Sequence, residues 1–404
     1  MKTFITVVIV NLFMLIAISS VCRCEGIAVV VDRDREGERM TSVCIVTPEG
    51  EEGPCFMKDI FPSEYVWEGI SYHQSGKFLI AEKQSPKELW MFTIDGGQKM
   101  IAASENGFGA VAFAGSEPVV FYYILDADYK LHLYSMRIPD DLDAEPEISE
   151  CPGNFPEGLM VDTKNRRILY FTLSEQTSAQ ILVSCDLECK NQTAEIALPK
   201  DVTVNTNSAV LSPDGNLVMY HGFYGGNLPV GLFLTDIAAK ESRDVIINHR
   251  AALGEGQPDR YSFSPDMTNI AFTFFGKDGN YEFYMVSSDG KTLHKAQSDE
   301  IETFRSTTPK WHPSGKWATV AAVLKNRDES DVYSFSTEGE LKNLTSGQGG
   351  HKWGQAISPS GRYLAYISGD NQALMLFDCE NMKGVGAFQV PGYYAYPVWI
   401  AYDQ

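Results

Sequence analysis

The stretch LSPDGNLVMYHGF occupies residues 211–223, and a near-copy, FSPDMTNIAFTFF, occupies residues 263–275. Each copy places a polar turn between two apolar segments. In such a turn proline presets φ, aspartate bonds back to the backbone, and glycine takes the positive φ that closes a hairpin. The segment after the turn is apolar on both faces, as a strand must be when its sheet lies between two others. The pair therefore predicts a repeated hairpin in stacked β-sheets.

The hairpin recurs along the chain. When the copies are aligned on the last apolar residue before the turn, these anchor residues lie 41 to 52 residues apart. This spacing is typical of a four-stranded propeller blade rather than of a helical repeat. The anchors are Tyr72, Phe113, Val161, Leu211, Phe263, Trp311, Ile357 and Trp399.

The two ends of the chain complete the pattern. Residues 396–404 (YPVWIAYDQ) repeat a first strand and stop where its turn is expected, whereas residues 26–57 read as a blade that lacks its first strand. Joined, they form one blade, and a closed ring leaves only short sheet edges. We predict an all-β chain whose single domain, residues 25–404, is a propeller of eight four-stranded blades closed by a blade shared between the termini. Seven blades is the alternative.

The segments SPDGNLVMY, FSPDMTNIAFTFF and IAVVVDRDREGE resemble the WD40-like repeats of TolB-type β-propellers, which also form the propeller domain of dipeptidyl peptidase IV-like proteases. The resemblance covers nearly all of residues 25–404, although the copies at Tyr72, Phe113 and Val161 lack the Pro-Asp pair. It implies a propeller fold and says little about function, because one fold hosts many activities. The chain has no G-x-S-x-G motif and no room for a hydrolase domain after the last blade, so we expect no peptidase activity.

Residues 1–24 read as a secretory signal peptide, with a lone Lys2 before an apolar run and cleavage after Cys22 or Cys24. An uncleaved membrane anchor is the alternative. We expect a secreted, extracellular protein, periplasmic if the source is bacterial. The formal net charge of −20 repels phosphate groups, which argues against nucleic acid and membrane partners.

Six cysteines follow the predicted signal peptide, and an even number in an oxidising compartment suggests disulfides. Cys44 and Cys55 are the most local pair, because the intervening residues would turn one strand back on the next. The connectivity of Cys151, Cys185, Cys189 and Cys379 stays open, and Cys185 and Cys189 could bridge each other or compete for Cys151. Metal binding is the weaker interpretation of these spacings. The sequons at Asn191 and Asn343 predict glycosylation in a eukaryotic host.

Seven histidines are scattered over the chain without an H-E-x-x-H motif. His73 and His312 follow anchors and are expected in turns, and His221 is expected as a hydrogen-bonded core residue within a strand. Scattered histidines could still converge in a propeller channel, as a metal-dependent enzyme would require. One sequence does not show whether they do.

Propellers present ligands to the mouth of the channel, where the first strands begin. Positions four residues before the anchors should line that mouth, and aromatic or charged residues stand beside some of them. The candidate ligand-binding residues are Trp67, Glu68, Glu157, Asn207, Asp259, Arg260, Trp353 and Tyr394. An acidic, aromatic mouth suits a cationic peptide, a sugar or a calcium ion. The alternative is that these residues are merely solvated or bond to strand ends.

From these patterns we predict a non-catalytic recognition module, expected to be a monomer, that binds a protein or glycan partner at its acidic channel mouth. No cofactor is expected, with calcium left open. The alternative is a propeller enzyme, a polysaccharide lyase or hydrolase with a metal in its channel. The enzyme needs histidines, or a histidine with carboxylates, that converge in the channel.

Overall fold

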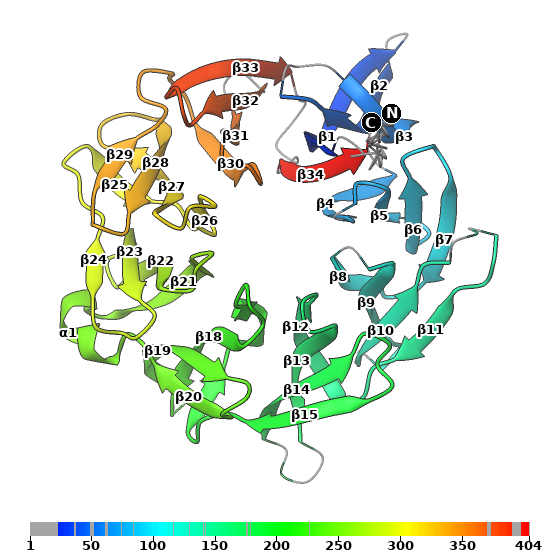
Figure 1. The fold of residues 1–404 in the computed structure, drawn as a ribbon, viewed down its shortest axis with the longest axis horizontal. Coiled ribbons are helices and arrows are strands. Elements are labelled where there is room, and N and C mark those ends of the chain that lie inside the picture. Colours follow the sequence, from blue (N-terminus) through cyan, green and yellow to red (C-terminus); the bar gives the residue numbers. More distant parts are fainter. Residues whose placement is uncertain are drawn as a thin grey trace, which may run out of the picture.

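The chain forms a closed ring of eight antiparallel β-sheets (Figure 1). The computed structural model describes residues 23–35, 38–48, 52–60, 64–73, 75–83, 85–115, 117–128, 130–139, 141, 143–174, 177, 179–225, 227–369, 373–389 and 397–403. Most of the predicted signal peptide, residues 1–22, lies outside this set. No helix among the described residues has the length and apolar character needed to span a bilayer.

Each sheet is one blade, and the blades follow one another around the ring. Blade 1 contains β4 (Tyr65–Tyr72), β5 (Phe78–Lys83), β6 (Glu88–Thr93) and β7 (Gln98–Ala103). Blade 2 contains β8 (Phe108–Phe113), β9 (Val119–Leu125), β10 (Leu131–Arg137) and β11 (Glu147–Glu150). Blade 3 contains β12 (Asn154–Asp162), β13 (Arg167–Leu173), β14 (Gln180–Asp186) and β15 (Gln192–Ala197). Blade 4 contains β16 (Val202–Val204), β17 (Val210–Leu211), β18 (Leu217–Tyr224), β19 (Asn227–Asp236) and β20 (Glu241–Asp244).

The second half of the ring repeats this plan. Blade 5 contains β21 (Gly256–Phe263), β22 (Asn269–Gly276), β23 (Tyr281–Ser287) and β24 (Leu293–Lys295). Blade 6 contains β25 (Ile301–Phe304), β26 (Lys310–Trp311), β27 (Trp317–Leu324), β28 (Ser330–Ser336) and β29 (Leu341–Asn343). Blade 7 contains β30 (Lys352–Ile357), β31 (Tyr363–Ser368), β32 (Ala373–Asp378) and β33 (Lys383–Gln389). In blades 4 and 6 the first strand is split into two short pieces.

Blade 8 closes the ring with strands from both ends of the chain. Its order is β3 (Glu52–Ile60), β2 (Glu38–Val46), β1 (Arg23–Arg35) and β34 (Val398–Asp403). The predicted eight blades and the shared terminal blade are confirmed. One detail differs from the prediction: β34 runs on past the anchor Trp399 to Asp403, because β1 extends back to Arg23 and pairs with it there.

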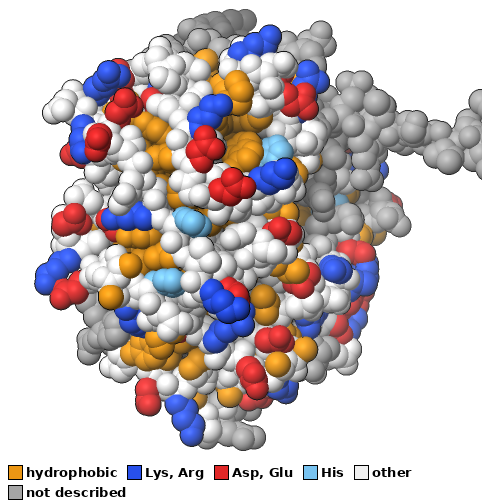
Figure 2. Space-filling view, turned by 60° about the vertical axis from the view of Figure 1, so that its left-hand side comes forward, with side chains coloured by type: hydrophobic (Ala, Val, Ile, Leu, Met, Phe, Trp, Pro, Cys, Tyr) orange, Lys and Arg blue, Asp and Glu red, His pale blue; other side chains and the backbone are white. Residues whose placement is uncertain are grey.

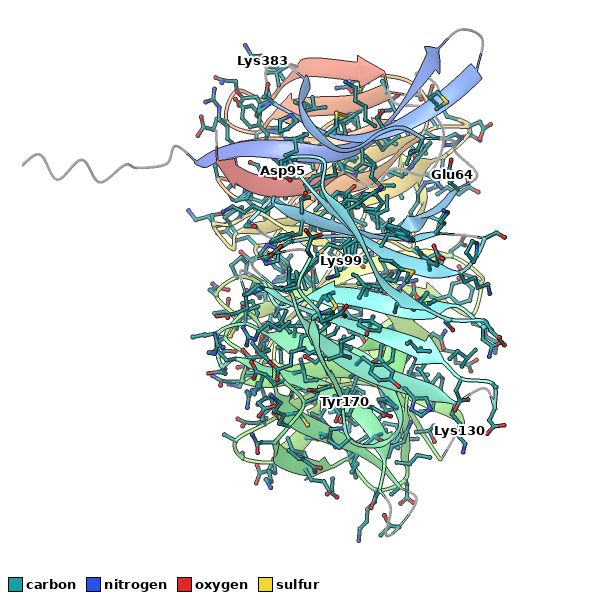
Figure 3. All side chains as sticks on the ribbon, turned by 90° about the vertical axis from the view of Figure 1, so that its right-hand side faces the viewer. Glu64, Asp95, Lys99, Lys130, Tyr170 and Lys383 are labelled. Atoms are coloured by element: carbon teal, nitrogen blue, oxygen red, sulfur yellow. A yellow bond between two sulfur atoms is a disulfide. The ribbon has the colours of Figure 1, made fainter. Side chains whose placement is uncertain are left out.

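The second strand of each blade is the core of the fold. Because its two faces meet the neighbouring sheets, its side chains are buried on both sides, as in β18 with Val218, Met219 and Tyr220. Equivalent aromatic residues, among them Tyr170 and Tyr366, are fully buried. Figure 3 shows the ring edge-on, with the sheets stacked face to face. The apolar stretches after the turns are therefore explained by packing between blades.

The end of the ring where first strands pass into second strands is called the turn face. Its turns repeat one chemistry. Ser212 Oγ donates to Asp214 Oδ1 (2.6 Å) and accepts from Leu217 N (2.9 Å). Ser264 and Asp266 make the same contact at 2.6 Å. The fourth turn residue takes a positive φ whether it is Gly215 (78°) or Met267 (61°).

Side chains of these turns also reach the next blade. Arg167, held by Asp162 at 2.8 Å, donates through Nη2 to Gly215 O (2.7 Å). The turn histidines do the same: His73 Nε2 lies 3.0 Å from Glu117 O, and His312 Nε2 lies 3.1 Å from Gly361 O. The prediction that both histidines sit in turns is confirmed, and they link successive blades.

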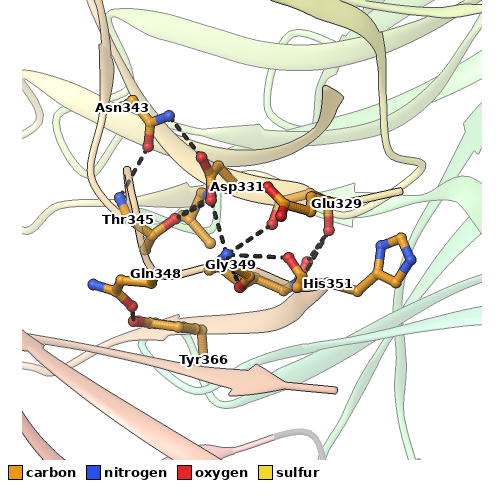
Figure 4. A network of polar contacts seen from close by, with 12 residues as sticks. Glu329, Asp331, Asn343, Thr345, Gln348, Gly349, His351 and Tyr366 are labelled. Carbon is orange, nitrogen blue, oxygen red and sulfur yellow. Dashed lines mark hydrogen bonds and ion pairs between the residues drawn. The ribbon is translucent and has the colours of Figure 1, made fainter. Parts of the chain in front are cut away.

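A buried charged network joins blades 6 and 7 (Figure 4). The ammonium of Lys352, a residue 1% exposed, lies 2.9 Å from Asp331 Oδ1 and donates to the carbonyls of Gly349 (2.7 Å) and Gly350 (3.1 Å). Asp331 also accepts from the Asn343 amide nitrogen at 2.8 Å. The predicted glycosylation site Asn343 thus donates to a buried carboxylate, whereas Asn191 is exposed and its amide nitrogen donates to Asp186 Oδ2 at the surface (2.6 Å).

Two disulfides are present among the described cysteines. Cys44 is bonded to Cys55 across the β2–β3 pair, as expected from the sequence. Cys151 is bonded to Cys189, which resolves the alternatives that the sequence left open. Cys185 and Cys379 are free, and burial raises the pKa of the Cys185 thiol. Cys185 is therefore expected to be unreactive.

Candidate functional site

The end of the ring opposite the turn face, where the first strands begin, is called the mouth face. In blades 1 to 7 the first strand is interrupted there. Register shifts interrupt β4, β8, β12, β21 and β30, and a non-strand segment divides the first strands of blades 4 and 6. Such interruptions release side chains from regular alternation and re-aim them. The mouth is therefore built from residues that the strand ladder does not constrain.

Most of the predicted mouth residues that can be placed do lie at these interruptions. Glu157 is exposed in β12, Asn207 is exposed in the 3-10 turn η1 (Thr206–Ser208), and Asp259 and Arg260 occupy the irregular part of β21. Trp353 in β30 is half-buried and packs against the apolar cluster between blades 7 and 8. The predicted residues Trp67 and Glu68 belong to β4, but their side chains, like all of Tyr394, lie outside the described part of the chain.

Both described mouth carboxylates bridge neighbouring blades. Glu157 Oε2 accepts from Thr206 Oγ1 at 2.5 Å, and Asp259 Oδ2 accepts from the Ser306 hydroxyl. Gly158 allows the first approach, because a Cβ there would lie 2.3 Å from Thr206 O. These carboxylates therefore hold first strands together while remaining at the mouth.

A cavity lies in the channel among blades 5 to 8 and extends from the mouth toward the turns at Pro313 and Pro359, and we call it the channel cavity. It comprises two hollows of about 250 Å³ and about 660 Å³ that share Thr308, Lys310, Gly354 and Gln355 as walls. The smaller hollow is also lined by Arg260, Ser306 and Thr307. The larger one lies toward the turn face against Trp311 and Trp399. The combined space is within the range of about 300–1,000 Å³ that is typical of ligand sites.

The walls of the channel cavity are cationic. Arg260 and Lys310 line it, and no carboxylate belongs to the described lining. Burial within the channel lowers the pKa of the Lys310 ammonium, although the side chain is exposed to the cavity. The expected acidity of the mouth is therefore combined with positive charge deeper in the channel.

Sequence reasoning missed Lys310 and Gln355, because it considered only positions four before the anchors. Yet both residues depart from the repeat. The residue just before the anchor is apolar or serine in the other seven copies and lysine only at 310. Two residues before the anchor, an amide occurs only at Gln355. A departure from the repeat at a position that faces the channel is the signal that could have found them.

The described histidines do not assemble a metal site. His221 is 5% exposed in β18, where its Nε2 lies 2.9 Å from Asn205 Nδ2. This confirms the expected hydrogen-bonded core residue, and burial lowers the pKa of His221 to about 4. His132 lies on the outer strands, between Asp126 (2.9 Å) and Glu150 (2.7 Å). Within the described ranges no group of three histidine, cysteine or acidic side chains is placed to hold a metal ion.

A separate pocket of about 400 Å³, outside the channel cavity, lies on the mouth face between blades 4 and 5. Its floor is apolar, with Val230, Ile246 and Phe274. Arg250 stands at its wall, paired to Asp244 at 2.7 Å. It adjoins the glycine-rich segment of residues 221–231 and is the other candidate contact surface on this face.

No protein-family model matches the chain, and no curated protein matches its sequence. Solved structures resemble it over most of its length. Apo AztD from Citrobacter koseri gives a TM-score of 0.57 at 12% identity, covering 94% of this chain and 98% of that one. Dihydro-heme d1 dehydrogenase NirN gives a TM-score of 0.61 at 12% identity, with 92% and 74% covered. TolB from Acinetobacter baumannii gives 0.41 at 12% identity, with 78% and 79% covered. These identities show a shared β-propeller fold alone.

Proposed function

We propose that the protein is a secreted, non-catalytic recognition module that binds a protein or glycan partner at its channel mouth. The observation that carries this proposal is the channel cavity, a ligand-sized space whose smaller hollow lies where the first strands are interrupted and whose larger hollow continues toward the turn face. Its hydrogen-bonding walls, including Thr307, Lys310 and Gln355, are formed by side chains rather than by the repeated turns. A few convergent polar groups in a concave site are what recognition requires.

The charges favour a polar partner segment. Glu157 and Asp259 lie at the channel mouth, Arg260 stands beside Asp259 at the entrance to the cavity (Nε to Oδ1 4.0 Å), and Lys310 stands within. A partner segment with hydroxyl groups, or with both positive and negative charges, complements this arrangement of charges. A uniformly anionic polymer is repelled by a chain of net charge −20. Figure 2 shows acidic and basic side chains interspersed over the outer surface of one side of the ring, so that surface offers no comparable charge arrangement.

We further propose that the blades are TolB-type, WD40-like repeats. The shared Ser-Pro-Asp turn, with its serine-to-aspartate hydrogen bond in blades 4 and 5, supports this assignment. Two disulfides support secretion, because such bonds persist in oxidising compartments. Closure of the ring within one chain supports a monomer, since no long sheet edge requires a partner.

The test compares capture of partners from the native extracellular fluid by immobilised wild-type protein and by matched variants. Glu157→Gln with Asp259→Asn removes two mouth charges while keeping an oxygen acceptor for Thr206 and Ser306. Glu241→Gln with Glu338→Gln removes two exposed charges elsewhere. We expect the mouth variant to lose capture and its salt dependence, and the control to keep both. Unchanged capture by the mouth variant at low and high salt would reject the mouth as the site.

The same preparation tests the enzyme alternative. Polysaccharides of the native fluid are incubated with the protein, with and without a chelator, and chain cleavage is measured. We expect no cleavage under either condition. Cleavage that the chelator abolishes and the mouth variant lacks would replace the recognition function by a metal-dependent lyase or hydrolase.

A further inference from the structure

Lys310 is a cation with no described partner inside the channel. It follows Pro309 at the start of β26 and lines both hollows of the channel cavity. Its backbone is held in the ladder, where Lys310 pairs with Thr319. Among the described residues no carboxylate lies within ion-pair distance of its ammonium, whereas the buried Lys352 is paired with Asp331 at 2.9 Å. Lys310 is exposed, and an unpaired ammonium at a cavity wall is stabilised by an anion that enters beside it.

Gln355 supplies a second and independent sign of a ligand. The residue is 4% exposed, and its Nε2 donates to Thr307 Oγ1 at 3.2 Å. This bond fixes the amide in β30, but Gln355 Oε1 has no hydrogen-bond partner in the described structure. A buried acceptor without a donor costs about 1–3 kcal/mol, so a rotation of the amide that turns Oε1 toward the cavity would let a donor from a bound molecule satisfy it.

The side chains of Lys310 and Gln355 line the same positively charged cavity. Lys310 and Gln355 both line the two hollows, and Arg260 stands at the entrance to the smaller one. The described lining holds two cations and no carboxylate, in a chain with 53 acidic and 33 basic residues. Arg260 is partly compensated, because its Nε lies 4.0 Å from Asp259 Oδ1, whereas Lys310 has no described acidic partner. This local reversal of the overall charge favours an anionic group. It disfavours an amine as the donor to Gln355, because a second positive charge would face Arg260 and Lys310.

We propose that the channel cavity binds a hydroxycarboxylate group, with the carboxylate at the Lys310 ammonium and the neighbouring hydroxyl donating to Gln355 Oε1. This assignment rests on the proposed recognition function and names the chemistry of the partner group that enters the channel. Thr307 and Thr308 offer further hydroxyls beside the same space. Trp311 and Trp399 provide apolar wall deeper in the channel.

The test is calorimetric titration of the full-length protein with four small probes. Gluconate carries a carboxylate beside hydroxyls, sorbitol carries the hydroxyls alone, acetate the carboxylate alone, and serine an ammonium beside the carboxylate. We expect gluconate to bind at least tenfold more tightly than each of the others. Tighter binding of serine than of gluconate would overturn the hydroxyl assignment, and equal binding of sorbitol would overturn the carboxylate assignment.

Variants locate the site. Lys310→Met should weaken gluconate binding at least tenfold, Lys310→Arg should retain it, and Gln355→Leu should weaken it severalfold. Lys316→Met, which removes an exposed lysine of the same blade at the turn face, is the matched control and should bind as the wild type does. Thermal melting of each variant checks folding, and Lys310→Arg reports on the site even if Lys310→Met does not fold.

Gluconate binding that is absent in the wild type, or unchanged in Lys310→Met, overturns the proposal. Such a result is distinguishable from failure of the recognition function. If capture of the native partner still depends on Glu157 and Asp259, the recognition function stands and only the hydroxycarboxylate assignment falls. If gluconate binds at Lys310 but the mouth variant captures its partner unchanged, the recognition function falls instead.

Discussion

The turn face and the mouth face of the ring are built from the same strands, but the contacts between blades recur on the turn face and differ from blade to blade on the mouth face. On the turn face, blades 4 and 5 use the same serine-to-aspartate contact, and His73 and His312 make matching bonds to the next blade. On the mouth face the contacts between blades differ: Glu157 meets Thr206, Asp259 meets Ser306, and Thr307 meets Gln355. Packing between blades imposes the repeat on one face, and the other face is free to carry a binding site.

Both faces depend on a closed ring, so loss of ring closure should lower the free energy of unfolding more than any other change. Deleting residues 398–404 removes β34, so that β1 loses one of its two partners and the face of blade 7 loses the cover of Trp399. The expected cost is comparable to the whole stability of a domain, about 5–15 kcal/mol. The measurement is secreted yield together with thermal melting. A truncated protein with wild-type yield and melting temperature would contradict closure by β34.

One added methyl group on the turn face tests how closely the side chains of neighbouring turns pack there. In Gly215→Ala the new Cβ would lie 2.4 Å from Asp162 Oδ2 and 2.6 Å from Asn165 Nδ2, at a φ of 78°. We expect a loss of about 3 to 4 kcal/mol, from left-handed strain together with disruption of a buried contact.

The matched control for this substitution is Gly279→Ala. Gly279 has a φ of 84° but no atom within 4 Å of its ideal Cβ. It should therefore cost only the strain, about 1 kcal/mol. Denaturant unfolding measures both, and equal losses in the two variants would show that contacts between turns contribute little.

Burial lowers the pKa of His73 and His312 on the turn face and that of His221, and the largest pH effect is expected from His221. On the turn face both ring nitrogens of His73 and His312 have partners, whereas Nδ1 of the buried His221, near Asp259, has none. Because the folded pKa of His221 is lowered to about 4, its neutral form is favoured by folding. The stability it contributes is complete above pH 6.5 and is lost as pH falls toward 4, by about 3 kcal/mol.

The measurement is the free energy of unfolding between pH 7 and pH 4 for the wild type and for His221→Gln. Glutamine keeps a donor and an acceptor but does not titrate. We expect the variant to lose less stability on acidification than the wild type. Parallel pH profiles would show that His221 is already charged in the folded protein or is not buried.

The smallest expected effect concerns the two sequons. The amide nitrogen of Asn343 donates to the buried Asp331, so a glycan at Asn343 would remove a donor from the network around Lys352. Asn343→Ala should cost about 1 to 2 kcal/mol, and Asn191→Ala should leave stability unchanged. Peptide mapping of protein secreted from a eukaryotic host should find a glycan at Asn191 and none at Asn343. A stable protein glycosylated at Asn343 would contradict the network.

Much of the fold could be predicted because packing between blades forces the same residues to recur. The Ser-Pro-Asp turns, the anchor spacing and the apolar segments after them identified eight blades, including the one that joins the termini. The extension of β34 to Asp403 could not be predicted, since it depends on how far β1 runs in the opposite direction. The pairing of Cys151 with Cys189 depends likewise on contacts between blades 2 and 3 that spacing does not encode.

The candidate site was predicted less completely. Glu157, Asn207, Asp259 and Arg260 were found because they occupy one position of the repeat and the residue beside it. Lys310 and Gln355 lie one and two residues before their anchors, where the other copies hold residues of a different kind. Whether a side chain at these positions meets the channel is decided by the interruption of the first strand, which depends on neighbouring blades. The recurring residues predict the fold, and the residues that depart from the repeat indicate where a ligand would bind.

Hydrogen–deuterium exchange of the full-length protein, with and without its captured partner, tests most directly that the mouth face is the binding face. The account predicts that the partner slows exchange in residues 256–261, 304–309 and 352–356, around the channel cavity. Exchange in the turns of residues 212–217 and 264–269 should stay unchanged. Protection confined to those turns or to the outer strands, with none around the cavity, would contradict it.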